Sequence, residues 1–211
     1  IALFIVATPA LNRIVEWNEA MHLPEALYNI EQWMRQQENA ATKITEQILQ
    51  VNSFSHFLAV IFGIGILTGI GEEMIFRGVL QRIVQDKNHR AHVAVWICAF
   101  LFSAIHLQFY GFIPRLLLGA FFGYLLIWSK NLWLPIFAHL FNNSTVACIS
   151  YFTNDKSPDN LIETIGTSGS PTSWLAGASL IGTVILLYVL YKKVFVSKSK
   201  EFFPMEDKIT P

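Results

Sequence analysis

Three short motifs place ionisable or amide side chains inside otherwise apolar stretches of the sequence. They are "EEMIFR", with Glu72, Glu73 and Arg77; "FSAIH", which ends in His106; and "HLFNN", with His139, Asn142 and Asn143. Such groups are costly in hydrocarbon, so they usually face the interior of a helix bundle and mark a functional site. A carboxylate, two imidazoles and an amide together supply an acid–base pair and hydrogen-bond donors, which is a complete set for hydrolysing an amide bond.

The spacing within the motifs assigns different roles to neighbouring residues. Side chains four residues apart share a helix face, so Glu73 and Arg77 can form an ion pair, and His139 and Asn143 can point to one place. Glu72 lies about 100° around the helix from Glu73 and is left to face other groups. The spacing therefore predicts a structural Glu73–Arg77 pair and a free Glu72 carboxyl that can take a proton from water and return it to a leaving amine.

The composition is that of a membrane protein. Of the 211 residues, 53% are hydrophobic and 14% are charged, and the mean hydropathy is +0.43. The net charge of zero argues against a nucleic-acid partner, because no basic surplus is available to neutralise phosphates. A helix needs about 20 mostly apolar residues to cross a bilayer. Five stretches fit, so we expect an all-α, polytopic transmembrane bundle of about five full spans: 54–80, 92–110, 113–128, 132–152 and 174–195.

The rest of the chain divides around these spans. The apolar opening "IALFIVATPAL" is too short to span, so we expect the tail of a truncated N-terminal span. Polar helices, extracytoplasmic or interfacial, should follow up to residue 53, because their apolar residues recur at helical spacing. We expect a four-span catalytic core over 54–152, an extracytoplasmic loop over 153–173, and a last transmembrane helix with a cytoplasmic tail over 174–211.

Basic residues in the short loops predict the orientation, because lysine and arginine mark the cytoplasmic side. The intervening segments are acidic or nearly neutral, and the basic regions alternate correctly to share one side. This predicts a cytoplasmic C-terminus, and a small chain without a visible organelle-retention tail fits a bacterial inner (plasma) membrane. The basic residues are Arg82, Lys87 and Arg90 after the first full span, Lys130 after the third, and Lys192, Lys193, Lys198 and Lys200 in the tail.

The three motifs also occur together, in this order, in a known family. "EEMIFR" reads as EExxxR, "FSAIH" as FxxxH and "HLFNN" as HxxxN, each on its own predicted span, and the last spacing selects Asn143 over Asn142. This combination resembles the CPBP intramembrane proteases, which comprise the CAAX prenyl proteases and the bacteriocin-processing and self-immunity enzymes. The likeness covers about residues 54–152.

The resemblance implies a water-activating pair and an oxyanion site, both of which suit amide hydrolysis. It also implies that a neighbouring carboxylate and guanidinium support the site. In this sequence Glu72 and His106 would activate water, His139 and Asn143 would stabilise the oxyanion, and Glu73 and Arg77 would support them.

A metal is an open alternative at the same residues. The family has been described as metalloproteases, and Glu72, His106 and His139 would make a possible zinc set with an open fourth position. It is also described as using a glutamate-activated water without metal. The three residues are spread over three spans without a compact HExxH arrangement, which slightly favours the metal-free mechanism. The expected cofactor is therefore none or Zn²⁺.

Other classes of function fit the same residues. A Glu–Arg pair can be purely structural in a membrane helix, and a single His or Asn is often an interhelical hydrogen-bonder. The groups could form a proton or ion relay in a transporter or channel, although the span count is small and no inverted repeat is visible. A catalytically silent scaffold is a third reading. The complete set of groups on three spans favours a hydrolase.

The preferred interpretation is an intramembrane endopeptidase that opens towards the cytoplasm. Its expected partners are membrane lipid and a peptide or protein segment near the membrane. The resemblance implies C-terminal tails of lipidated, CAAX-type proteins or leader-bearing peptides as substrates.

Overall fold

The computed structural model describes residues 1–88, 91–153 and 164–192. Within these ranges every regular element is a helix, which confirms the predicted all-α class. The elements in chain order are α1 (Ala2–Glu19), η1 (Glu25–Leu27), α2 (Tyr28–Leu49), α3 (Phe54–Val60), η2 (Ile61–Leu67), α4 (Thr68–Glu73), η3 (Met74–Leu80), α5 (Gln81–Asn88), α6 (Ala91–Ala104), η4 (Phe109–Gly111), α7 (Phe112–Ser129), α8 (Trp133–Thr153) and α10 (Leu175–Val189).

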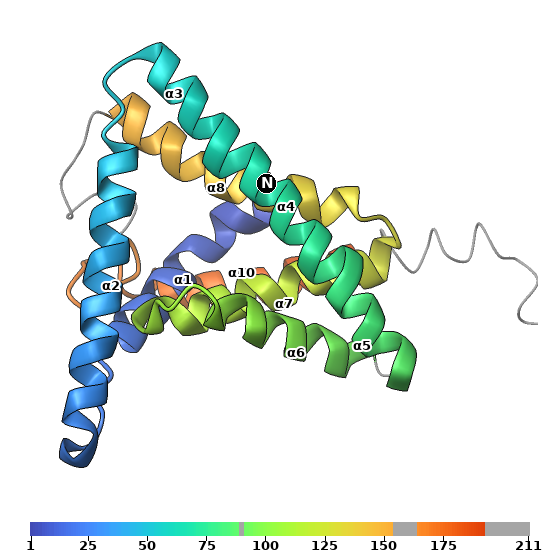
Figure 1. Ribbon diagram of the computed structural model, residues 1–211, viewed down its shortest axis with the longest axis horizontal. Helices are drawn as coiled ribbons and strands as arrows, with labels where there is room; N and C mark the ends of the chain where they lie inside the picture. Colours follow the sequence, from blue (N-terminus) through green and yellow to red (C-terminus); the bar gives the residue numbers. More distant parts are fainter. Residues whose placement is uncertain (89–90, 154–163, 193–211) are drawn as a thin grey trace, which may run out of the picture.

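One long helical rod carries the two glutamates. It runs from α3 to α5 without a break and crosses the molecule diagonally in Figure 1. Ser53 caps its start, because its extended backbone lets Oγ accept the amide of His56 at 3.2 Å. Two stretches of the rod, η2 and η3, are π-helical, and the six-residue α4 that contains both glutamates lies between them. Such π segments occur often at functional sites.

Three helices of the described chain are long and apolar enough to cross a membrane, namely 54–85, 109–129 and 175–192. Most of their residues are not buried inside the protein, as expected for surfaces that face lipid. The α6 helix is also apolar but has only 14 residues. The 21-residue α8 is not among the three, because His139, Asn142 and Asn143 lower its hydropathy. The bundle is of membrane type. Two of the five predicted spans, 92–110 and 132–152, do not correspond to helices that are both long and apolar enough to cross a membrane.

The predicted span 92–110 is wrong in its extent. The α6 helix ends at Ala104, so His106 lies in a turn and not on a membrane helix. Leu107 adopts a left-handed conformation with φ of 53°, which an α-helix cannot continue through. The next helix, α7, begins at Phe112 and holds Pro114 in its first turn, where the missing N–H removes no helical hydrogen bond. The sequence offers no glycine or proline at residues 104–107 to announce this end.

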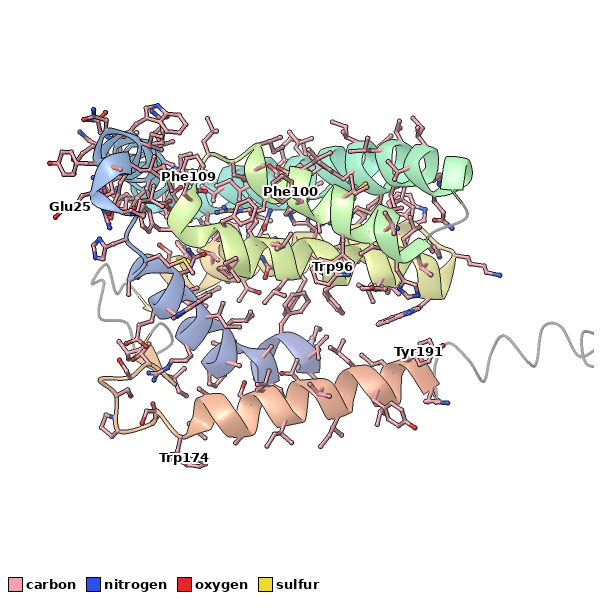
Figure 2. The ribbon with its side chains drawn as sticks, turned by 90° about the horizontal axis from the view of Figure 1, so that it is seen from below. Glu25, Trp96, Phe100, Phe109, Trp174 and Tyr191 are labelled. Carbon is pink, nitrogen blue, oxygen red and sulfur yellow. The ribbon has the colours of Figure 1, made fainter. Side chains whose placement is uncertain are left out.

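The helices α1 and α10 lie side by side and form a separate layer (Figure 2), where Trp174 and Tyr191 mark the two ends of the α10 region. Ser179 of α10 joins them, because its Oγ accepts the Ala10 amide at 3.1 Å and donates to the Val6 carbonyl at 2.5 Å. In an uninterrupted α1, the Ala10 N–H would bond to the Val6 carbonyl. The Ser179 hydroxyl lies between these two groups instead, and Ala10 directly follows Pro9.

The α6 and α7 helices pack very closely at Gly119. A Cβ at this position would lie 3.1 Å from Phe102 Cδ1 and 3.3 Å from the Cα of Ala99, which is backbone and cannot rotate away. Small residues at such crossings let membrane helices approach each other. The contact fixes the helix that leads to His106 against the helix that follows it.

We expect Gly119→Leu to destabilise the protein by about 1–3 kcal/mol, because the added side chain overpacks this crossing. The matched control is Gly63→Leu, since a Cβ at Gly63 meets nothing within 4 Å. Thermal unfolding in detergent should show a lower midpoint for the first variant only. Equal midpoints would show that the crossing can relax.

A polar corner joins α1 and α2 outside the spans. The Glu31 carboxylate accepts hydrogen bonds from Arg35 at 2.7 and 3.0 Å and from the Leu23 amide at 2.9 Å, and His22 Nδ1 lies 3.0 Å away. Arg35 also lies over the ring of Tyr110 in η4, with its Cζ atom 4.4 Å from the centroid. The corner therefore contacts the segment that follows His106.

Acid should weaken this corner. The hydrogen bonds from Arg35, Leu23 and His22 lower the pKa of Glu31 from 4.5 to about 2. Because the folded pKa lies below the unfolded value, the stabilisation is complete above pH 4.5 and is lost as the pH falls towards 2. We expect Glu31→Gln to lower the unfolding midpoint near neutral pH, and this deficit to vanish towards pH 2. A deficit that stays constant with pH would contradict the assignment, and Glu46→Gln on the exposed face of α2 is the control.

Candidate active site

A fully buried ion pair forms the base of the site. Glu73 Oε1 accepts a hydrogen bond from Arg77 Nη1 at 2.9 Å, and the two side chains are 0% and 1% exposed. The predicted i,i+4 pair is therefore present. The same Oε1 atom lies 2.8 Å from Nδ1 of His139 on α8, which the spacing did not predict. Glu73 thus joins the rod to α8 as well as pairing with Arg77.

A second set of hydrogen bonds joins the rod to α7. Arg77 Nη2 donates to the Gly119 carbonyl at 2.7 Å, and Gln81 Nε2 donates to the Gly123 carbonyl at 3.2 Å. Both side chains are buried. The Arg77 guanidinium also lies over the Phe102 ring, with Cζ 4.8 Å from the centroid. These contacts hold the ion pair in one orientation, because Arg77 Nη2 and Gln81 Nε2 each have a fixed acceptor on α7.

Glu72 lies between two imidazoles. Its Oε1 is 3.9 Å from Nε2 of His106, and its Oε2 is 3.8 Å from Nε2 of His139. These separations exceed a direct hydrogen bond and suit groups that share a water molecule. The side chains of Glu72 and His106 are 24% and 26% exposed, whereas His139 is 4% exposed. The carboxyl is therefore reachable from the side of His106.

The hydrogen bonds of the two histidines decide which ring nitrogen is basic. Nδ1 of His106 lies 2.7 Å from the Phe102 carbonyl, which can only accept, so this nitrogen carries the proton. An ionised Glu73 imposes the same choice on Nδ1 of His139. In both neutral rings Nε2 is then the proton acceptor, and in both it faces Glu72. The Phe122 ring stacks on His139 with centroids 4.9 Å apart and fixes its plane.

Asn143 lies one turn along α8 from His139 but has different partners. Its Nδ2 donates to the Ile64 carbonyl in the π-helical η2 at 3.2 Å, and its Oδ1 accepts from Asn142 at 3.4 Å. Asn143 therefore connects α8 to the rod on the N-terminal side of Glu72. One N–H of its amide is left for another acceptor.

Two residues near the site escaped prediction from the sequence. Gln81 continues the face of Glu73 and Arg77 by one more step of four, and that spacing could have revealed it. Arg115 is a cation in the apolar stretch "FIPRLLLG", and its charge interacts with both Glu72 and His106. An arginine in such a stretch is itself a signal of function.

The residues proposed as zinc ligands do not form a metal site. Among the described residues, no group of three or more His, Cys, Asp or Glu side chains has a geometry that could hold a metal ion. The Glu72 oxygens lie 3.9 and 3.8 Å from the Nε2 atoms of His106 and His139. The zinc alternative and the name metalloprotease therefore have no support in this arrangement.

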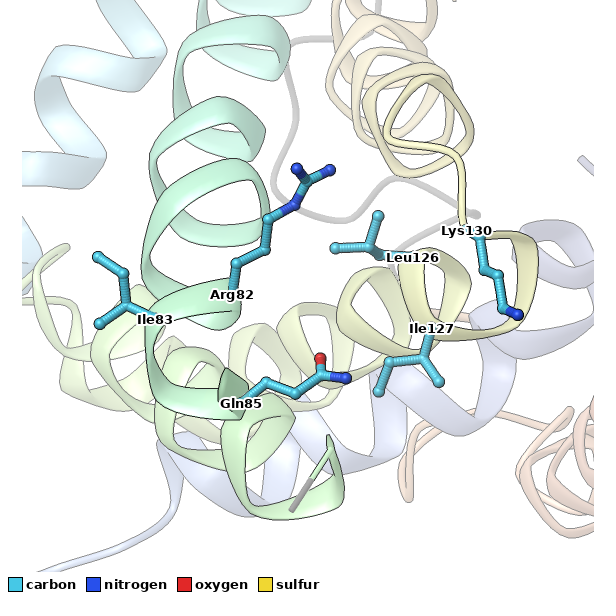
Figure 3. A pocket seen from close by; sticks show the side chains of 6 residues that line it. All are labelled: Arg82, Ile83, Gln85, Leu126, Ile127 and Lys130. Carbon is cyan, nitrogen blue, oxygen red and sulfur yellow. The ribbon is translucent and has the colours of Figure 1, made fainter. Parts of the chain in front are cut away.

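A separate hollow of about 660 Å³ lies at the far end of the rod, between α5 and the end of α7 (Figure 3). Arg82 and Gln85 extend from α5 towards Leu126 and Ile127 of α7, and Lys130 lies at its edge. None of the residues of the three motifs lines it. It is therefore distinct from the candidate active site.

The fold and the site together define the class of protein. It is an all-α bundle of membrane type that holds a buried Glu–Arg–His cluster. Residues 54–145 match the model of a family described as "Type II CAAX prenyl endopeptidase Rce1-like". This segment contains all three motifs, and the match confirms the resemblance drawn from them. The printed description is that of a family of endopeptidases.

Among curated proteins, the chain has a relative of low sequence identity. The chain is 29% identical over 109 residues to "Uncharacterized protein YpbD" of Bacillus subtilis (strain 168). The alignment covers 50% of this chain and 51% of the relative, so the chain spans about half the length of the curated relative it matches. No solved structure gives a significant match to the chain.

Proposed function

We propose that the protein is an intramembrane endopeptidase in which Glu72 and His106 activate a water molecule. The observation that carries the proposal is the position of the Glu72 carboxyl, within 3.9 Å of two imidazole Nε2 atoms and partly exposed. A protease family match over the same segment supports it. A carboxylate and an imidazole that converge on one small space are suited to deprotonate water.

In the proposed reaction, Glu72 takes a proton from a water held between it and Nε2 of His106. The water oxygen attacks the carbonyl carbon of the scissile bond, and a tetrahedral oxyanion forms. Glu72 then returns the proton to the leaving amine as the C–N bond breaks. Each step uses groups of this chain, and no metal is required.

The oxyanion would be stabilised by His139 and Asn143. A protonated His139 donates from Nε2, while Nδ1 stays bonded to Glu73, whose negative charge stabilises the imidazolium. Asn143 would donate its second amide N–H. Glu73 and Arg77 act as positioning residues, because Glu73 bonds Nδ1 of His139, Arg77 pairs with Glu73, and both side chains are fully buried.

The family points to the substrate. It suggests membrane-associated peptides or proteins, and prenylated CAAX-type tails are the proposed class. The exposed apolar residues along the rod, such as Phe62, Leu67, Met74 and Ile75, support an integral membrane location. We propose a bacterial inner membrane with the C-terminus in the cytoplasm, on the basis of the lysine and arginine distribution.

The test is cleavage of a mixed library of prenylated and unprenylated peptides by the purified protein, read by mass spectrometry. We expect new products from the wild type and none from Glu72→Gln at equal folded yield. A folded wild type that cleaves nothing would contradict the proposal. Proton flux into proteoliposomes, measured in parallel, would then show whether the same groups serve transport.

A further inference from the structure

Arg115 is a cation near the site that no described carboxylate neutralises directly. Its Nη1 donates to the Gln108 carbonyl at 3.3 Å and its Nη2 to Gln108 Oε1 at 2.7 Å, and both acceptors are neutral. No ion pair within 4.0 Å joins Arg115 to any described residue. A cation in an apolar helix is energetically costly when no opposite charge neutralises it, so an anion is expected to bind there.

Arg115 is positioned so that its charge interacts with the proposed reacting groups. It lies in the first turn of α7, and its charge interacts with those of Glu72 and His106 and with Glu38 of α2. Its Nε makes no hydrogen bond with a described residue and is not fully buried, so this N–H group is accessible. An approaching anion can therefore reach the guanidinium beside the site.

The chemistry favours a carboxylate as this anion. A guanidinium binds a carboxylate through two parallel, charge-assisted hydrogen bonds. Glu38 and Glu72 lie close enough to repel a doubly charged group such as a phosphate monoester more strongly than a singly charged one. An endopeptidase that acts near the end of a chain meets one such group on every substrate, namely the C-terminal carboxylate.

We propose that Arg115 binds the C-terminal carboxylate of the substrate peptide and so selects bonds a few residues from a free C-terminus. This inference rests on the proposed endopeptidase function. It assigns specificity to a residue outside the three motifs.

A structural role for Arg115 makes a different prediction. Through the Gln108 carbonyl, Arg115 also holds the turn that contains Leu107 and His106. If that were its whole role, substitution would weaken every substrate equally. A carboxylate receptor instead distinguishes a free C-terminus from a blocked one, and only this discrimination should depend on Arg115.

The experiment measures binding of a fluorescent peptide with a farnesylated cysteine followed by three residues, as the free acid and as the C-terminal amide. The protein is the full chain carrying Glu72→Gln, in nanodiscs of neutral lipid, so that no cleavage occurs. We expect the acid to bind at least about 10-fold more tightly than the amide. Adding Arg115→Gln should abolish this preference and leave the affinity for the amide unchanged.

Two further variants sharpen the result. Arg115→Lys keeps the charge and should retain part of the preference, and Arg82→Gln removes a cation from the distant hollow and should retain all of it. Equal binding of acid and amide by the parent, or a parallel loss for both peptides in Arg115→Gln, would overturn the proposal. Loss of the preference in nanodiscs that contain phosphatidylglycerol would also overturn it, in favour of a lipid headgroup site.

Wild-type cleavage of the same two peptides separates this inference from the function on which it rests. Absence of cleavage by folded wild type contradicts the endopeptidase proposal, whatever the binding shows. Cleavage of the acid and the amide at equal kcat/KM contradicts the role of Arg115 alone. A lower KM for the acid, lost in Arg115→Gln at similar kcat, is the expected outcome.

Discussion

Glu72→Gln is expected to lower kcat/KM for peptide cleavage by about 10³-fold and to leave the fold intact. The amide has the shape of the carboxyl but cannot accept the proton of water, and general-base catalysis contributes about 10²–10⁴-fold. Glu72 makes no hydrogen bond with any described residue, and its carboxylate oxygens lie 3.9 and 3.8 Å from the Nε2 atoms of His106 and His139. Its substitution should therefore cost little stability. Initial rates and unfolding midpoints of the same preparation check both parts.

The matched control is Glu46→Gln, which makes the same chemical change on the exposed face of α2. Its rate should equal that of the wild type. A Glu72→Gln variant that keeps more than about a tenth of the activity would exclude Glu72 as the base, because the lower limit for that role is about 10²-fold.

Arg77→Met should cause the largest loss of stability, about 3–5 kcal/mol, because it leaves the Glu73 carboxylate buried without its cation. The Gly119 carbonyl loses a hydrogen bond at the same time. The double variant Glu73→Gln/Arg77→Met removes both charges and should recover part of the loss. Thermal and denaturant unfolding in detergent are the measurements.

The exposed Arg82 offers the comparison for this change. Arg82→Met should leave the unfolding midpoint almost unchanged, since an exposed cation contributes about 1 kcal/mol or less. If Arg77→Met were as stable as Arg82→Met, or if the double variant were less stable than the single one, the pair would not carry the buried charge as described.

Local spacing predicted the parts of the site that lie within one helix. Glu73 and Arg77 are four residues apart and are paired, and Glu72, one residue earlier, faces elsewhere. The apolar stretches also indicated the helical class. These inferences succeed because helix geometry fixes the relation between near neighbours in the chain.

Contacts between helices could not be predicted in the same way. The bond from His139 to Glu73 joins residues 66 positions apart, and the bond from Arg77 to Gly119 joins residues 42 positions apart. Their formation depends on how three helices pack. The early end of α6 follows from the backbone conformation of Leu107, a residue type that gives no turn signal. His106 consequently reaches Glu72 from a turn.

The π-helical segments on either side of α4 make backbone carbonyls available to side chains beside the glutamates. A π segment holds one residue more than the α-helix it replaces, and in η2 the carbonyls of Gly63 and Ile64 accept side-chain hydrogen bonds from Thr68 and Asn143. Removing a single residue from η2 would restore ordinary helix geometry and leave the part of the rod beyond it in nearly the same orientation relative to α3, because the wider turn absorbs its extra residue locally. The extra residue therefore frees backbone carbonyls for Thr68 and Asn143 without redirecting the two glutamates.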